Sequence, residues 1–564
     1  MISAARQPRA RRLRAAVRAA ALPLGLGAAV AAFASAFSLL SIERHDAFNT
    51  GRFDLGNMTQ AVWATAHGHF LQVTNLAGEQ TSRLGSHFDP ILAALAPLWL
   101  AWPSPDLLVC VQAIAVGLGA VPVFRLACKH LGSPRTAAAS ALAYLLYPAV
   151  EWLVLNEFHP VAFACPLLLF AFWYLDENRL LPFAAFATLA VMSKEEIGLV
   201  VAGFGLWYAI TRRRVRSGIA LAAAGVAVSA IAVEVVVPHF SGGASSFYSR
   251  YSEVGGSPGG IVRTLATHPL RLLRHVFAAA DLRYLGHLLV PLGGLWALAP
   301  AALLAALPEA GLNALSSNPY QRSIHFHYTA GLIAPLFVAS ILGTAAAARR
   351  WRGAAAVAGP AVLLLAIASN YHLGAVPLWA GLPGGDGYQQ HATRVTAHDR
   401  LSARAVALVP PDAVVSATNA LGGHLSARRR ILSFPRLDDA TWVAVDETQG
   451  SYLDGSAPLP MAADLAALRR NPDWRLVFTQ DGISVFHRVA HVAAPAGGGR
   501  SVTAAAGGGL RSRRRACATS GSRPLRAAST GAPPRRRAAT GSRRDPDRDP
   551  SPARPGPRCV RGSA

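Results

Sequence analysis

Charged side chains are scarce in this 564-residue sequence and make up only 15% of it. An ordinary soluble domain has about 25%. Hydrophobic residues reach 52%, and apolar runs near the roughly 20 residues needed to cross a bilayer recur along the chain. The composition excludes a typical soluble protein and predicts a polytopic membrane protein.

Cysteine is also scarce, and its five occurrences form no CxxC pair. Three of them lie in apolar runs, where cysteine behaves as a small hydrophobic residue. The sequence therefore predicts neither a disulfide framework nor a zinc site. The five are Cys110, Cys128, Cys165, Cys517 and Cys559.

Acidic residues are few, with 30 Asp and Glu against 54 Lys and Arg, and the net charge is +24. The last 65 residues carry 16 Arg and 3 Asp, which accounts for +13 of it. Residues 491–564 are rich in Arg, Pro, Ala and Gly and lack the apolar content that offsets the entropy of ordering, so we predict a disordered tail. Such a tail could touch anionic lipid, but without interleaved aromatic residues it indicates no specific nucleic-acid partner. An aberrant reading-frame end would have the same composition.

The distribution of arginines predicts the orientation in the membrane. Residues 1–20 carry six arginines and no acid, so we expect this basic segment in the cytoplasm, followed by an uncleaved first span rather than a cleaved signal peptide. Arginine clusters at 212–216 and 349–352 are expected on the same side. If the apolar block 285–315 is split near Pro300 into two short crossings, both arginine clusters lie in the cytoplasm. This gives about eleven transmembrane helices. The prediction is an all-α polytopic domain, 21–371, in the plasma membrane.

The same alternation places the first loop, 44–105, and the chain beyond residue 371 outside the cytoplasm. Residues 372–490 combine β-type runs with two segments of helical spacing, which predicts a small extracytoplasmic α/β domain. Gln480-Asp481-Gly482 is typical of a hairpin turn. We expect strands at 413–418, 430–434, 441–446, 475–478 and 483–488, and helices at 401–408 and 462–470.

Four polar clusters fall on the outer side of this topology, although they are far apart in sequence. Ionisable groups near span ends are costly unless they pair or line a wet cavity. Their shared side therefore predicts a cavity that opens to the outside. The clusters are Asp54 with His87 and Asp89, then Asn156, Glu157 and His159, then Lys194, Glu195 and Glu196, and finally Asn318, Arg322, His325, His327 and Tyr328.

Some of these residues also have a purely structural interpretation. Asp54 could be the N-cap of the helix that follows it. His87 and His159 each lie close to a proline and could cap helices that enter the membrane. Under this interpretation the loop residues would support the fold and carry no chemistry.

The other two clusters have similar alternatives. The 194–196 cluster could be a solvated turn between two spans. His325 and His327 have i, i+2 spacing, which on a strand puts both on one face and could bind a metal, but no third ligand follows at a usual spacing. The metal question stays open from the sequence.

Several short motifs resemble one known family. They are Phe53-Asp54-Leu55-Gly56, Ser86-His87-Phe88-Asp89-Pro90, Phe158-His159-Pro160, Lys194-Glu195-Glu196, and Ser316-Ser317-Asn318-Pro319 with Gln321-Arg322 and His327-Tyr328. Over about residues 30–490 the chain resembles the uncharacterised-domain family 2079 (DUF2079) of polytopic membrane proteins. That family often has a second Asp shortly after the first motif, whereas this sequence has Thr59. A partner carboxylate would have to come from Asp89 or from another loop.

The layout in turn resembles the C-superfamily (GT-C) glycosyltransferases, which have many spans, an acidic first external loop and an extracytoplasmic C-terminal domain. The resemblance implies transfer of a sugar from a polyprenyl-phosphate donor in the membrane lipid to an extracytoplasmic glycan, lipid or protein acceptor, with Asp54 as general base. Arg322, with Lys194 or His327, would hold the donor phosphate. His87 and Asp89 would orient the base or hold a divalent cation, which stays open as a cofactor.

The remaining members of the clusters are expected to bind substrate: Glu157, His159, Glu195, Glu196, Asn318, His325 and Tyr328. Two other functions fit the same hydropathy. A multi-pass transporter or lipid-handling protein would have its substrate site near the bilayer midplane. A non-catalytic envelope scaffold would leave the polar clusters scattered.

Overall fold

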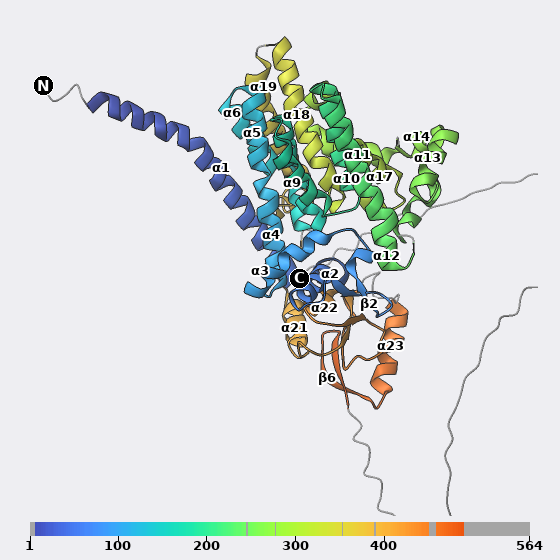
Figure 1. Cartoon of the computed structure of the whole chain (residues 1–564). Coiled ribbons are helices and arrows are strands. Elements are labelled where there is room, and N and C mark those ends of the chain that lie inside the picture. Colours follow the sequence, from blue (N-terminus) through green and yellow to red (C-terminus); the bar gives the residue numbers. More distant parts are fainter. Residues whose placement is uncertain are drawn as a thin grey trace, which may run out of the picture. The chain divides into compact units, whose positions relative to one another are not determined.

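The computed structural model describes residues 6–243, 246–276, 278–351, 353–388, 391–450 and 458–489. They form a helical bundle followed by a small domain built on a five-stranded sheet (Figure 1). The architecture is therefore the expected combination of a helical membrane domain and an α/β domain. The tail that we expect to be disordered, 491–564, lies outside the described residues.

Five helical segments of the described chain are long and apolar enough to cross a membrane. A sixth would be the pair α6 (Pro134–Leu145) and α7 (Pro148–Leu155), which bends by 42°. The bend occurs where Pro148 has no N–H to continue the hydrogen bonds of α6. The five segments are Ala21–Asp46, Pro105–Leu131, Val215–Ser241, His327–Arg350 and Ala356–Leu373.

The expected count of eleven spans is not confirmed. The block 285–315 does not form two crossings, because Pro291, Pro300 and Pro308 each lie at the start of a separate short helix. Four other apolar helices in the described residues have only 10–17 residues, which is short for a bilayer. These are Pro90–Ala101, Pro160–Asp176, Leu180–Val191 and Ile197–Thr211.

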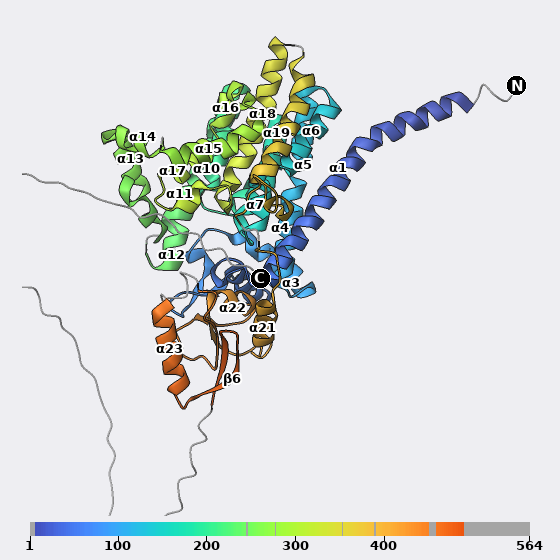
Figure 2. The ribbon, with the colours of Figure 1, turned by 180° about the vertical axis from the view of Figure 1, so that it is seen from behind.

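Small residues let two neighbouring helices of the bundle, α10 (Ile197–Thr211) and α11 (Val215–Ile231), pack closely (Figures 1 and 2). A Cβ atom at Gly198 or Gly225 would collide with the facing backbone. The other helices before the sheet domain are α1 (Arg6–Asp46), α2 (Asn57–Ala66), α3 (Ala96–Ala101), α4 (Pro105–Leu118), α5 (Ala120–Leu131), α8 (Ala164–Asp176), α9 (Leu180–Val191), α12 (Val237–Ser241), α13 (Pro258–Thr267), α14 (Pro269–Val276), α15 (Ala279–Leu289), α16 (Pro300–Leu303), α17 (Leu307–Leu315), α18 (Ala330–Arg350), α19 (Ala354–Leu373) and α20 (Pro377–Ala380).

The loop between α1 and α4 is itself folded. It contains α2 and a short antiparallel hairpin of β1 (Gln72–Thr74) and β2 (Gln80–Ser82). Its apolar side chains form a separate buried cluster that includes Leu55, Val62 and Leu92. The polar residues of this loop are therefore held on a rigid support.

The C-terminal domain contains all five strands expected from the sequence, in the order β4-β3-β5-β7-β6. The turn between β6 and β7 has positive φ at Asp481 (50°) and Gly482 (79°), as its Asp-Gly sequence predicts. The elements are α21 (Ala397–Val406), β3 (Val415–Ala417), α22 (Asn419–His424), β4 (Ile431–Ser433), β5 (Trp442–Asp446), α23 (Pro458–Arg470), β6 (Trp474–Gln480) and β7 (Ile483–Arg488).

Helices cover both faces of this sheet (Figures 1 and 2). Ala444 of β5 is buried in the same cluster as Leu421 of α22, whereas its neighbour Val443 is buried with Leu465 of α23. This alternation follows from the period of two along a strand. The domain therefore has a helix–sheet–helix layering with an apolar core on each side.

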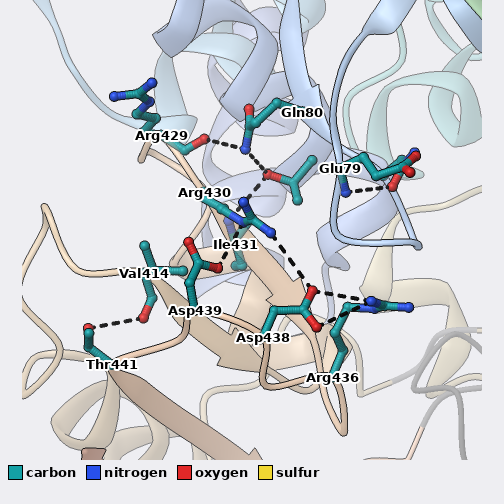
Figure 3. Close-up of polar contacts among 12 residues, drawn as sticks. Glu79, Gln80, Val414, Arg429, Arg430, Ile431, Arg436, Asp438, Asp439 and Thr441 are labelled. Atoms are coloured by element: carbon teal, nitrogen blue, oxygen red, sulfur yellow. Dashed lines mark hydrogen bonds and ion pairs between the residues drawn. The ribbon is translucent and has the colours of Figure 1, made fainter. Parts of the chain in front are cut away.

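Buried polar contacts join the first loop to this domain. The Arg52 guanidinium donates to the carbonyl oxygens of Thr74 (3.0 Å) and Ile431 (2.6 Å), and also to Ser433. The Gln80 side chain donates to the Arg429 carbonyl at 3.0 Å, next to the ion pairs of Arg430 (Figure 3). Since Arg52 is almost completely buried, these bonds are shielded from water and fix the loop against β4.

Candidate functional site

Asp54 lies in a short π-helical turn, Arg52–Gly56, directly before α2. The backbone N–H groups of Gly51 and Leu55, on either side of it, both donate to Glu157 Oε2 at 3.0 Å. Glu157 comes from the segment after α7 and adopts a positive φ of 58°. A carboxylate from a distant loop therefore fixes the turn that carries Asp54.

The N-cap interpretation of Asp54 is wrong. The N-cap residue of α2 is Gly56, and no side chain bonds to the helix start. The Asp54 carboxylate instead faces His159, with 3.4 Å between Oδ1 and the Nε2 atom of the ring. His159 is buried, whereas about half of the Asp54 side chain (48%) is exposed. The arrangement leaves the carboxylate accessible to a substrate.

The pKa values of Asp54 and Glu157 move in opposite directions. Burial raises the pKa of Glu157 to about 7, and the charge of Asp54 adds to this effect. Burial also opposes ionisation of Asp54, but the contact with His159 and the positive charge of Arg83 lower its pKa below the usual value. Below about pH 7 the negative charge of the pair is therefore mainly on Asp54.

The ring of His159 stacks on that of His327, with 3.8 Å between ring centroids. His327 lies at the start of the segment His327–Arg350, far from His159 in sequence. The stack brings the second and fourth polar clusters together beside Asp54. Neither histidine caps a helix with its side chain.

The interpretation of residues 194–196 as a solvated turn is also wrong. Glu195 accepts from the His87 ring at 2.8 Å and from the Phe88 backbone N–H at 3.0 Å, and Lys194 pairs with Glu196 at 2.7 Å. Burial opposes the charge of Glu195, but the His87 ring lowers its pKa to about 2. These side chains form a fixed ionic cluster against the first loop.

Asp89 is buried and held by Arg83, whose Nε and Nη2 atoms both lie 2.9 Å from Asp89 Oδ2. Its engagement with Arg83, and that of Glu195 with His87, do not favour a divalent cation at these residues. Among the described residues, no group of three or more His, Cys, Asp and Glu side chains is arranged to hold a metal. His325 and His327 do not act as a pair, since His325 contacts Asp386 at 2.7 Å.

A cavity of about 810 Å³ joins these elements, and we call it the central cavity. Its wall around Asp54 is polar and includes Asn57, Arg83 and Glu157. Eight of the thirteen residues proposed from sequence line it. They are Asp54, His87, Asp89, Glu157, His159, Lys194, His327 and Tyr328.

A second cavity of about 230 Å³, the apolar pocket, adjoins the central cavity. Both are lined by His87, Lys194, Arg250 and Tyr328, which form the boundary between them. Glu195 and Glu196 also line the apolar pocket. The rest of its wall includes the aliphatic side chains of Leu199, Val233, Val237, Ile261 and Leu312, together with polar and aromatic residues such as Tyr248, Tyr251, Glu309, Asn313 and Gln321.

Three residues proposed from sequence line neither cavity. Arg322 pairs with Asp281 at 3.3 Å, His325 pairs with Asp386, and the Asn318 side chain accepts from the Tyr320 backbone N–H at 3.1 Å. Arg322 is therefore engaged outside both cavities. The arginine that lines both of them is Arg250.

Sequence reasoning missed Arg44, Arg250 and Glu309, each of which lines one of these cavities. Glu309 was detectable as a single ionisable residue inside an apolar run, a pattern that indicates a functional site, whereas Arg44 lies in the charged stretch Glu43-Arg44-His45-Asp46. Thr59 is fully buried and lines neither cavity, so the second carboxylate near Asp54 is Glu157.

Two crystal structures of ArnT from Cupriavidus metallidurans have a similar fold. The apo structure has a TM-score of 0.50 at 13% identity, and the structure bound to undecaprenyl phosphate has a TM-score of 0.46 at 12% identity. Each similarity covers 84% of this chain and 99% of ArnT. No curated protein sequence matches the chain. The family described as "Predicted membrane protein (DUF2079)" matches residues 44–485. The chain therefore belongs to the DUF2079 family of membrane proteins.

Proposed function

We propose that this protein is an integral membrane glycosyltransferase that transfers a sugar from a polyprenyl-phosphate donor to an acceptor outside the cytoplasm. The observation that carries the proposal is the two-part cavity. Its polar part contains an accessible carboxylate, its apolar part carries several aliphatic side chains, and cationic groups lie at the boundary. The fold it shares with ArnT, a C-superfamily glycosyltransferase, supports the same class of enzyme.

The boundary suits the phosphate of the donor. Lys194 and Arg250 line both cavities, and Arg250 Nη1 lies 3.4 Å from the Tyr328 hydroxyl. Two cations near a phosphate favour the charge that builds up when the bond from the sugar to the phosphate oxygen breaks. The polyprenyl chain would then occupy the apolar pocket, which offers it several aliphatic side chains.

Asp54 is our proposed general base. As the acceptor oxygen bonds to the anomeric carbon, its proton moves to the Asp54 carboxylate, and the sugar–phosphate bond breaks to release polyprenyl phosphate. The contact with His159 keeps Asp54 charged and oriented, and Glu157 fixes the turn beneath it.

The test is transfer of labelled sugar from polyprenyl-phosphate donors by the purified full chain in liposomes, with envelope extract as acceptor. We expect Asp54→Asn to lower the rate by about 10²-fold or more, as for loss of a general base, with membrane insertion unchanged. Glu79→Gln is the matched control, because Glu79 is an exposed acid of the same loop that lines neither cavity. Full activity of Asp54→Asn, or no transfer by the wild type, would contradict the proposal.

A further inference from the structure

Arg44 lies near the end of α1, and its side chain is buried (6% exposed). Its Nε and Nη1 atoms form no hydrogen bond with any residue that the structure describes. A buried guanidinium without partners is costly, so its retention calls for a reason. Arg44 lines the central cavity and also a third cavity of about 620 Å³, which we call the side cavity.

The acids near Arg44 do not provide the missing partners. Asp54 lies against His159, and Glu157 uses Oε2 to accept from the Gly51 and Leu55 backbone N–H groups. No carboxylate of the described residues forms an ion pair with Arg44. Arg44 lines both the central cavity and the side cavity, so an occupant of these cavities is the partner that its guanidinium can meet.

The side cavity has a basic wall. Besides Arg44 it is lined by Arg394 and His391, and also by His398, whose ring contacts the carboxylates of Asp446 (2.9 Å) and Asp481 (2.8 Å). Its acidic residue, Asp399, has its carboxylate engaged by the backbone N–H and hydroxyl of Thr396 in the capping box of α21. The charges of this wall favour an anionic occupant over a neutral or cationic one.

The central cavity shares lining residues with the side cavity and, separately, with the apolar pocket, and Arg44 belongs only to the first of these shared sets. Arg44 and Tyr388 are shared with the side cavity, whereas Lys194 and Arg250 are shared with the apolar pocket. Of the three cavities, Asp54 lines only the central one. If the donor phosphate is held at Lys194 and Arg250, Arg44 is left for the other substrate.

We propose that Arg44 binds an anionic group, a carboxylate or a phosphate, of the acceptor, which reaches Asp54 through the side cavity. The planar fork of a guanidinium matches either group with two parallel hydrogen bonds. This inference rests on the proposed glycosyltransferase function, because it assigns the acceptor of that reaction. The anion could be part of a soluble glycan or of a lipid head group.

The test measures binding without any donor, so its result is independent of sugar transfer. The full chain in phosphatidylcholine nanodiscs is treated with phenylglyoxal, and modification of Arg44 is followed by peptide mass spectrometry. Glucuronate and glucose 6-phosphate are the soluble anions, glucose is the neutral probe, and discs doped with phosphatidic acid supply a lipid-borne phosphate. We expect modification to slow by roughly tenfold with the anionic probes, as for a bidentate ionic contact, and not with glucose.

Protection by the soluble anions identifies a soluble acidic acceptor, and protection by phosphatidic acid alone identifies a lipid-borne one. Equal protection by glucose, or no protection by any anion, would overturn the inference. Arg44→Gln should weaken binding of the protecting anion by about tenfold, and Arg44→Lys by less, because it keeps the charge without the fork. Arg436→Gln, at an exposed pair in the C-terminal domain, is the control. If the wild type transfers no sugar but anions still protect Arg44 from modification, the proposed function is overturned and anion binding at Arg44 stands.

Discussion

The Nε2 atom of His159 lies 3.4 Å from Oδ1 of Asp54. This partner distinguishes Asp54 from two other acids of the site. Asp89 is tied to Arg83, and Glu195 is tied to His87. Asp54 faces the ring of His159 and is half exposed. Of these three acids it is the one whose side chain is accessible from the central cavity.

Replacement of His159 tests this relationship. Because His159 helps to lower the pKa of Asp54, His159→Gln should raise that pKa and move the acid limb of the pH–rate profile to higher pH. His69→Gln, at an exposed position of the same loop, should leave the profile unchanged. An unchanged acid limb in His159→Gln would show that Asp54 is not the group that titrates.

Glu157 should make stability depend on pH. Burial raises its pKa from 4.5 to about 7 in the folded state, so the folded protein binds the proton more tightly than the unfolded one. Its contribution to stability is complete below pH 4.5 and is lost as pH rises through about 7. The Tm of the wild type in detergent should therefore fall between pH 5 and 8 relative to Glu157→Gln. Parallel curves for the two proteins would exclude this role.

Lys194 should affect the lipid donor more than the acceptor. Loss of a buried cation that faces a phosphate costs roughly 2 kcal/mol or more, so Lys194→Gln should raise the KM for polyprenyl-phosphate sugar by at least about tenfold. Lys194→Arg keeps the charge and should retain most of the affinity, and Lys129→Arg, at the ion pair with Asp176, is the control. Equal donor KM values for wild type and Lys194→Gln would remove the phosphate role.

Arg52 should be needed to dock the first loop on the C-terminal domain. Arg52→Gln leaves the carbonyl oxygens of Thr74 and Ile431 without their buried donors, which costs roughly 1–3 kcal/mol for each unsatisfied group. The free energy of unfolding should fall by at least that amount, and protease should cleave the chain between the two parts more rapidly. The exposed Arg436→Gln is the control, since its pair with Asp438 is solvated (Figure 3). Equal stability of the two variants would show that other contacts hold the domain.

The sequence by itself determined the class of protein and much of the local structure. The first apolar run is a helix long enough to span a membrane, and the Asp-Gly turn joins two paired strands, because both features depend on neighbouring residues. The number of membrane spans was harder to predict from the sequence. Proline positions in the block 285–315 break the helix locally, whereas hydropathy averages over them.

Only the tertiary structure decided which polar residues share a cavity. Asp54, Glu157 and His327 meet because three distant segments pack together, and no local pattern records that meeting. The sequence led us to expect Arg322 at the phosphate, but it pairs with Asp281, whereas Arg250, which the sequence did not single out, lines both cavities. The opposite pKa directions of Asp54 and Glu157 likewise arise from burial and from each other's charge, which exist only in the folded chain.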